Sequence, residues 1–435
     1  LDLSTASPLT SWVHIPLAQI PPWWRLAAAA LVLTGLLWPG PAGPAPGDPR
    51  PSRGAPSRPL RGALVLGITA AALGVFQLLR IRHELFGDAE FFRQILIEQG
   101  SPQNLSHRLY WAIWNLVARH APVRGPDDAL DLMRGISAVA GMIYVAVVAS
   151  QLLAVRPGRG APRLPLVLAL VLPGIQVFFF YPEVYGPALA GHLLLLMAWT
   201  RALDPAGTHA LRGVPAPGSE VLLLLAFDLA VELHSVALVL GPAVAWVVAG
   251  GLLARLRRAT DARARRRLAG VLALCGLVTA RLLFVLLEWF ASGPFDEVRF
   301  VGAGAGLTTP ASAGWLVDRV SALIWVAAPA VVLAPAALRR LLEPGARTWR
   351  VPVALAAGFH LVYLAVWRCD MGVCRDWDLF AASGLVWTWL AGLAAGSLAP
   401  GHPARRLGPL AVGIGAACTL CFLLANAAAK GPIYP

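Results

Sequence analysis

The sequence predicts an all-α fold, a polytopic bundle of transmembrane helices, and three observations support that prediction. Only 14% of the 435 residues are charged and 57% are hydrophobic, whereas soluble domains carry about 25% charged residues. The mean hydropathy is +0.66. Apolar runs recur along the whole chain, and a helix needs about 20 apolar residues to cross a bilayer. These observations exclude an ordinary soluble enzyme, a disordered protein and a disulfide-rich secreted module.

The apolar runs predict about twelve membrane-spanning segments, several of them too short for a straight crossing and therefore tilted or broken. The segments cover roughly residues 23–38, 62–81, 135–155, 164–180, 187–203, 220–234, 236–254, 268–290, 316–338, 351–367, 379–397 and 408–427. They divide the chain into an N-terminal part with the first span and a Pro-rich linker (1–61), a transmembrane core (62–397) and a C-terminal part with the last span (398–435).

Basic residues determine the expected orientation of these segments. The formal net charge is +13, and the arginines gather in short loops between apolar runs. These loops contain Arg50, Arg53, Arg58, Arg61, Arg156, Arg159, Arg163, Arg255, Arg257, Arg258, Arg263, Arg265, Arg266, Arg267, Arg339, Arg340, Arg347, Arg350, Arg405 and Arg406. With twelve crossings all of these loops fall on one face, which the positive-inside rule assigns to the cytoplasm. The pattern accounts for the charge without a nucleic-acid partner.

The longest segment on the opposite, outer face covers residues 82–134 and is amphipathic and mixed in charge. Within residues 88–99, apolar side chains share one helical stripe, which is typical of a helix that lies at the membrane interface. The stripe consists of Phe91, Phe92, Ile95 and Leu96. Tyr110, Trp111 and Trp114 follow, and we expect them at headgroup depth, where aromatic residues gather in membrane proteins.

Two acids open this outer loop in the motif Gly87-Asp88-Ala89-Glu90. In a loop, Asp88 and Glu90 can point into one cleft, where a carboxylate can act as a general base or the pair can hold a divalent cation. The alternative is structural, with Asp88 capping a helix and Glu90 favouring its first turn.

A second charged loop, residues 368–378, is expected on the same outer face. Its arginines, Arg368 and Arg375, can bind a phosphate through paired hydrogen bonds, while Asp376 and Asp378 orient them or a substrate hydroxyl. The alternative is a solvated loop with internal ion pairs, in which Asp378 caps the next helix.

An aromatic turn, Tyr181-Pro182-Glu183-Val184-Tyr185, follows the run Phe178–Phe180. Aromatic rings beside a carboxylate suit sugar binding, because rings stack on the C–H faces of a sugar and the acid accepts its hydroxyl protons. The alternative places Tyr181 and Tyr185 in an interfacial aromatic belt, with Glu183 in water.

Ionisable residues also occur inside predicted spans. A charge there costs about 2.5–3.5 kcal/mol at the bilayer centre and therefore faces a cavity or a partner. Asp228 and Glu232 lie at i and i+4 on one helical face, and either can pair with Arg281. With His234 they suit the proton relay of a transporter, the polar wall of a substrate cavity, or structural ion pairs. His360 is expected to be a hydrogen-bonded contact between helices.

Taken in order, these features resemble the GT-C superfamily of polytopic membrane glycosyltransferases, and in particular its bacterial members. The matching motifs are Arg80-Ile81-Arg82-His83-Glu84-Leu85-Phe86-Gly87-Asp88, Ser106-His107-Arg108-Leu109-Tyr110, the Tyr181–Tyr185 turn, His234 before Gly241-Pro242, and Arg375-Asp376-Trp377-Asp378-Leu379-Phe380. Ala89 stands where these proteins usually have glycine, and Pro182 interrupts the aromatic turn. The similarity spans roughly residues 80–390 and rests on order and topology.

The resemblance implies an enzyme of the bacterial inner membrane that transfers a sugar from a polyprenyl-phosphate donor on the outer face. It implies that Asp88 is the catalytic base or an acid of a metal site, and that the other candidates contact substrate. These are Glu90, Arg108, Glu183, Tyr185, His234, Arg368, Arg375, Asp376 and Asp378. A lipid-linked donor requires no nucleotide-binding motif, and the sequence has no P-loop or dinucleotide fingerprint. Two other functions stay open: a secondary transporter that uses the intramembrane acids, and an inactive scaffold of the cell envelope.

Overall fold

The computed structural model describes residues 57–81, 107–121, 123–154, 163–203, 218–291, 313–343, 347–366, 380–398 and 402–428. Within these ranges every regular element is a helix, as the composition predicts. The α-helices are α3 (Arg58–Leu78), α5 (Arg108–Ala118), α6 (Pro126–Ala154), α7 (Arg163–Val171), α8 (Tyr185–Leu203), α9 (Ser219–Leu233), α10 (Gly241–Arg258), α11 (Ala262–Ala291), α12 (Ala313–Leu342), α13 (Arg347–Val366), α14 (Ala381–Gly396) and α15 (Leu407–Ala428). The same ranges contain the short 3₁₀ helices η3 (Pro173–Phe178), η4 (Ser235–Leu240) and η8 (Pro403–Arg406).

Six of the described helical segments are long and apolar enough to cross a membrane, which indicates an integral membrane protein. They are Arg58–Leu78, Asp127–Ala154, Ser235–Arg258, Ala262–Glu288, Arg319–Leu342 and Trp349–Val366. Each predicted span from the second to the twelfth overlaps a described helix. The first predicted span, 23–38, and the predicted interfacial helix at 88–99 lie outside the described residues.

The structure has two breaks near the predicted spans, one within the fourth span and one at the junction of the sixth and seventh. The fourth consists of α7, which ends at Val171, and of η3, which begins at Pro173. Proline cannot donate a backbone hydrogen bond and its ring crowds the preceding turn, which favours a break at this position. A second break separates α9 from η4 at His234, whose backbone is extended with φ −165° and ψ 129°. Such breaks leave backbone N–H and C=O groups inside the bundle without their usual partners in the helix.

Helix α14 lies at the centre of the bundle. It carries no charged residue, and every side chain from Ala381 to Ala395 is buried. A helix that is apolar on all sides is stable only when other helices surround it, and α14 packs against α7, α8, α12 and α13.

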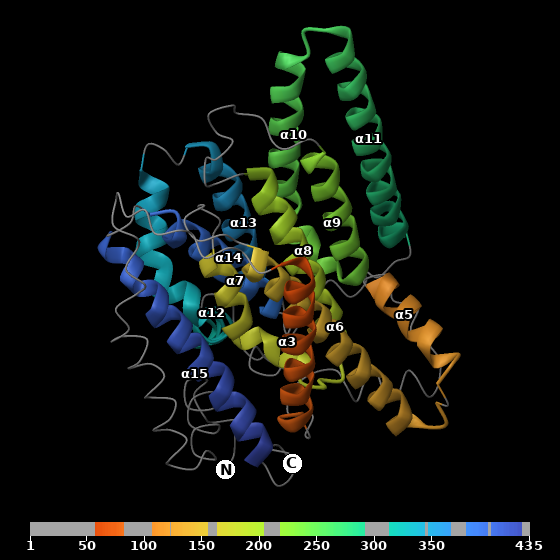
Figure 1. Cartoon of the computed structure of the whole chain (residues 1–435), viewed down its shortest axis with the longest axis vertical. Coiled ribbons are helices and arrows are strands. Elements are labelled where there is room, and N and C mark those ends of the chain that lie inside the picture. The colour runs from red at the N-terminus through yellow and green to blue at the C-terminus, as the bar shows by residue number, and fades with distance from the viewer. Residues whose placement is uncertain are drawn as a thin grey trace.

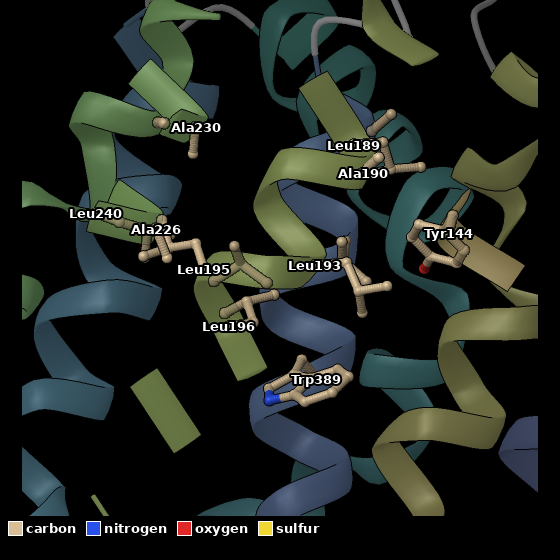
Figure 2. Close-up of a cluster of buried hydrophobic side chains, with 14 of the residues drawn as sticks. Tyr144, Leu189, Ala190, Leu193, Leu195, Leu196, Ala226, Ala230, Leu240 and Trp389 are labelled. Atoms are coloured by element: carbon tan, nitrogen blue, oxygen red, sulfur yellow. The ribbon is translucent and has the colours of Figure 1, made fainter. Parts of the chain in front are cut away.

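The other part of the core forms where α8 meets α6, α9 and α14 (Figure 2). Tyr144 and Trp389 approach the α8 leucines from the neighbouring helices. Leu189, Leu193, Leu195 and Leu196 of α8 are each no more than 1% exposed. The two large polar rings remain hydrogen-bonded, because the hydroxyl of Tyr144 donates to the Ala169 carbonyl at 2.9 Å and the indole of Trp389 donates to Thr200 Oγ1 at 2.8 Å.

Helix α12 bends where it crosses α14. Pro329 and Pro335 lie within α12, and Ala327 departs from helical geometry with φ −129° and ψ 26°. At this bend the backbone of α12 comes against Gly384 of α14, so that a Cβ atom on Gly384 would collide with the carbonyl oxygen of Val326. The close crossing therefore requires both a proline-induced bend and a residue without a side chain.

Arginines from two of the predicted cytoplasmic loops meet at one end of the bundle. Arg340 Nε donates to Ser397 Oγ at 3.0 Å, and Arg405 Nη2 donates to the Gly396 carbonyl at 3.1 Å. Arg350 Nη2 donates to the Glu343 carbonyl at 2.6 Å. In Figure 1 the α10–α11 loop, the end of α12 and the start of α13 all lie toward the top, whereas α15 ends at the bottom. This arrangement agrees with the prediction that these loops share one face, which we call the arginine-rich end.

A buried ion pair ties α9 to α10 at the arginine-rich end. The Arg255 side chain donates from Nε and Nη2 to the two carboxylate oxygens of Glu220 at 2.8 and 2.9 Å. The side chain of Glu220 is 1% exposed. Gly251 makes room for it, since a Cβ there would lie 2.6 Å from Glu220 Oε1. The pair is thus enclosed by protein rather than by solvent.

Replacing Arg255 by alanine is expected to lower the free energy of unfolding by about 3–5 kcal/mol, because it leaves the buried Glu220 carboxylate without its charge partner. Thermal unfolding of the purified protein in detergent measures this loss. Arg257→Ala is the matched control, since Arg257 lies on the same helix with an exposed side chain. Equal destabilisation by the two variants would contradict a stabilising role for the pair.

Candidate functional site

Three segments that lie far apart in the sequence meet at the end of the bundle opposite the arginine-rich end. They are the start of α5, the aromatic turn before α8, and the break between α9 and η4. The rings of His107 and His234 are perpendicular, with centroids 4.3 Å apart, and the Tyr185 ring lies 5.1 Å from that of His234. We call His107, Tyr110, Glu183, Tyr185 and His234 the outer cluster, because the sequence predicts this end of the bundle on the outer face.

The conformation of the aromatic turn is defined by its backbone torsion angles and by hydrogen bonds to its backbone. Phe180 adopts a left-handed conformation with φ 60°, which is uncommon for a bulky residue and costs about 1–2 kcal/mol. The chain then closes a tight turn in which the Glu183 amide donates to the Tyr181 carbonyl at 2.9 Å. Ser137 Oγ of α6 donates to the Glu183 carbonyl at 3.1 Å. The backbone of Glu183 is therefore held by hydrogen bonds at both its amide and its carbonyl.

Glu183 is buried, with 1% of its surface exposed. This excludes the alternative in which Glu183 is simply a solvated acid at the membrane surface. Burial raises the pKa of the Tyr110 hydroxyl, and the charge of Glu183 raises it further. Burial lowers the pKa of His107 to about 3, so this imidazole is neutral at ordinary pH. The outer cluster thus combines one acid with neutral hydrogen-bonding rings.

His234 has a defined tautomer. Its Nδ1 accepts a hydrogen bond from the Val236 amide at 3.0 Å and caps η4. Because an amide N–H can only donate, Nδ1 is unprotonated and the proton of the neutral ring lies on Nε2. His234 Nε2 is buried and has no hydrogen-bond partner within the described part of the chain.

Tyr110, Trp111 and Trp114 are buried in the protein. We expected these rings among lipid headgroups, whereas α5 turns them toward its neighbours in the bundle. The aromatic face of α5 packs on protein. Large aromatic rings are stabilised in the protein interior just as they are at a membrane interface. These rings therefore contact protein, and their predicted position at headgroup depth stays a prediction.

Arg108 lies next to the outer cluster but extends toward α11. Its Nη1 forms an ion pair with Glu288 Oε2 at 2.7 Å, and the two side chains are 33% and 41% exposed. An ion pair this exposed contributes about 0–1 kcal/mol. Because a guanidinium has five N–H donors, Arg108 retains donors for a phosphate while it pairs with Glu288.

Of the predicted site residues, Glu183, Tyr185 and His234 come together, and Arg108 lies beside them. The remaining ones lie outside the described residues: Asp88, Glu90, Arg368, Arg375, Asp376 and Asp378. Phe380, which ends the motif of the second charged loop, is fully buried, with its ring centroid 5.6 Å from that of Tyr363. His107 and Tyr110 were not predicted as site residues, although their i and i+3 spacing on α5 places them on one face.

The intramembrane acids form the ion pairs that their spacing predicts. Arg281 of α11 pairs with Asp228 and, at 2.9 Å, with Glu232. His360 Nδ1 lies 2.8 Å from Ser383 Oγ, which confirms its expected role as a contact between helices. Among the residues that the structure describes, no three His, Cys, Asp or Glu side chains are grouped to hold a metal ion. The acids of α9 are therefore engaged by Arg281, while His234 belongs to the outer cluster.

Comparison of the chain with protein-family models, curated proteins and solved structures finds no match.

Proposed function

We propose that this protein is a glycosyltransferase of the GT-C type that crosses the bacterial inner membrane about twelve times. It would transfer a sugar from a polyprenyl-phosphate donor to an acceptor on the extracytoplasmic face. The observation that supports this proposal is the convergence of three motifs on which the resemblance rests. The Ser106–Tyr110 motif, the Tyr181–Tyr185 turn and His234 contribute side chains to one cluster.

The chemistry of the outer cluster suits a sugar. Glu183 accepts hydrogen bonds from hydroxyl groups, His234 Nε2 donates one, and the ring of Tyr185 offers an apolar face to sugar C–H groups. Buried groups of this kind discriminate strongly, because a ligand that lacks the matching hydroxyl leaves them unpaired. In the proposal these residues orient the sugar together with Glu90, Asp376 and Asp378.

The transfer step needs one base and a site for the leaving phosphate. Asp88 accepts the proton of an acceptor hydroxyl as that oxygen attacks the anomeric carbon, and the bond from this carbon to the lipid phosphate breaks with inversion. Arg375, assisted by Arg368 and Arg108, neutralises the phosphate that departs. Exclusion of water strengthens these charge interactions, since they act at a low dielectric constant.

The experiment that tests the proposal is a transfer assay with the purified full-length protein in lipid vesicles. The vesicles receive radiolabelled polyprenyl-phosphate hexose and, separately, polyprenyl-phosphate pentose. Membrane extract of the source bacterium supplies the acceptor. Label that leaves the lipid fraction only when active protein is present supports transfer. If no donor loses its sugar while the protein stays folded, the proposal fails.

Replacing Arg375 by alanine is expected to raise KM for the lipid-phosphate donor about tenfold to a hundredfold, because a charge-assisted contact of about 1.5–3 kcal/mol is lost. The transfer assay at varied donor concentration measures the change. Arg347→Ala, at the start of α13 on the predicted cytoplasmic side, should leave KM unchanged. Equal effects of the two variants would contradict the proposed orientation.

A further inference from the structure

Several arginines at the arginine-rich end are bonded to other parts of the protein. Arg340, Arg350 and Arg405 donate hydrogen bonds to neighbouring segments. Arg255 pairs with the buried Glu220. The tip of the α10–α11 hairpin differs, because its arginines have exposed side chains; they are Arg257, Arg258, Arg263, Arg265, Arg266 and Arg267. With the exception of Arg258, none of these six has a bonding partner in the described part of the chain.

The tip of the hairpin concentrates positive charge. Helix α10 ends at Arg258 and α11 begins at Ala262, so the basic residues at the two helix ends lie close together, at the top of Figure 1. Asp261 is the only acid between residues 255 and 267, and its Oδ1 accepts from the Ala264 amide. Several of the arginines also occupy the first turns of α11, where the helix dipole disfavours cations. The protein itself therefore leaves this charge largely uncompensated.

Three of these arginines share one face of α11. Arg263, Arg266 and Arg267 have the i, i+3, i+4 spacing of neighbours on a helix surface. Leu268 is 7% exposed, so α11 packs on the bundle through a different face. The three guanidinium groups thus point away from the bundle and can meet on one ligand.

The same face of α11 becomes apolar toward the middle of the membrane. Leu274 follows Arg267 after two helical turns, and Leu277 lies one turn further. Their side chains are 52% and 69% exposed. From Arg267 to Leu277 the helix rises about 15 Å, which is half the thickness of the hydrocarbon core. An exposed apolar strip with the length of an acyl chain therefore continues the basic face.

The length of α11 places these arginines at the level of the lipid headgroups. The segment Ala262–Glu288 is long and apolar enough to cross a membrane. Between Arg267 and Glu288 the only charged residue is Arg281, and this part of the helix spans about 30 Å, the thickness of the hydrocarbon core. Arg267 then lies at one boundary of the core, with Arg263 in the headgroup layer beyond it.

We infer that this face of α11 is a binding site for one anionic phospholipid. The lipid phosphate lies between Arg263, Arg266 and Arg267, because guanidinium groups bind phosphate through charge-assisted, paired hydrogen bonds. One acyl chain lies on Leu274 and Leu277. The inference is independent of the proposed function, since it requires only that α11 crosses the membrane.

Two features favour an anionic phospholipid over other ligands. The sequence from residue 262 to residue 287 contains no acid, so the ammonium group of a zwitterionic lipid finds no partner on this face. A soluble polyanion would use the arginines alone and leave the apolar strip without a contact. Basic residues beside a membrane-spanning helix attract anionic headgroups at close range.

The first experiment measures lipid binding by native mass spectrometry of the full-length protein in detergent. Dioleoyl phosphatidylglycerol and, separately, dioleoyl phosphatidylcholine are added at rising concentrations. The first phosphatidylglycerol is expected to bind at least tenfold more tightly than phosphatidylcholine. Equal affinities for the two lipids would overturn the inference.

Replacing Arg263, Arg266 and Arg267 together by glutamine is expected to weaken binding of that phosphatidylglycerol about tenfold to a hundredfold, because each arginine contributes about fivefold. Arg266→Gln alone should weaken it about fivefold with the least disturbance of the fold. The matched control removes the same charge by glutamine substitution of three exposed arginines on other elements, Arg58, Arg339 and Arg406. The control should change the affinity by less than threefold. Equal losses in the two triple variants would show that overall charge, and not this face, governs binding.

The apolar half of the site is tested with the headgroup alone and with a labelled chain. Glycerophosphoglycerol should not displace the lipid at equal concentration, because it has no acyl chain to lie on Leu274 and Leu277. Phosphatidylglycerol with a diazirine in the middle of one chain should label α11 between residues 270 and 277. Displacement by the headgroup as effective as by the intact lipid would identify a site for soluble phosphate compounds instead. Labelling confined to other helices would refute the placement of the chain.

Discussion

Replacing Asp88 by asparagine is expected to lower the rate of sugar transfer by about 10²–10⁴, the range that a positioned general base contributes. The amide has nearly the shape of the carboxylate but cannot take the proton of the attacking hydroxyl. The expected loss is therefore in kcat, with donor binding retained. The transfer assay in vesicles measures it, and gel filtration in detergent establishes that the variant is folded.

Asp261→Asn is the matched control for this variant. Asp261 Oδ1 accepts from the Ala264 amide at 2.7 Å and so caps α11 near the arginine-rich end. Asparagine caps a helix about as well as aspartate, so both stability and transfer should be unchanged. Near-normal turnover by Asp88→Asn with a defined donor would show that another residue acts as the base.

Replacing Gly384 by alanine is expected to destabilise the protein by about 1–3 kcal/mol or more, the usual cost of an overpacked core. A single methyl group would collide with the Val326 carbonyl of α12, and a backbone atom cannot move aside as a flexible side chain can. A larger residue such as leucine is expected to prevent α12 and α14 from packing. Thermal unfolding in detergent measures the first effect, and the yield of monodisperse protein measures the second.

The control for Gly384 is Gly276→Ala on α11. A Cβ at Gly276 has no neighbouring atom within 4 Å, and alanine is a better helix former than glycine by about 1 kcal/mol. This variant should therefore be as stable as the parent or slightly more so. If the two alanine variants behave alike, the close contact of α12 with α14 is not a requirement of the fold.

The sequence predicts the helices well because local properties control them. Apolar length and the absence of charge predict most bounds of the described helices to within a few residues. The exceptions are α5, the starts of α6, α10 and α11, and the end of α7, where one predicted span covers both α7 and η3. The pairing of Arg281 with Asp228 and Glu232 was equally predictable, since residues at i and i+4 share a helical face and an intramembrane charge requires a partner.

Burial at the outer cluster was not predictable in this way. Tyr110, Trp111 and Glu183 have the composition of a wet membrane interface, and only the packing of α5 and the aromatic turn against neighbouring helices encloses them. A hydrophobic side chain is stable in an apolar surrounding, and both lipid and the protein interior provide one. The choice between them is made by contacts between segments that are remote in the sequence.

The sequence by itself determined the all-α class, the apolar helices and the loops in which arginines gather, because these follow from the composition of each segment and the thickness of a bilayer. The tertiary structure decided that His107, Tyr185 and His234 share one cluster. It also decided which nitrogen of His234 carries the proton, since a tautomer depends on the group that the ring meets. Local composition fixes where helices form, whereas the chemistry of a site arises from the partners that folding brings together.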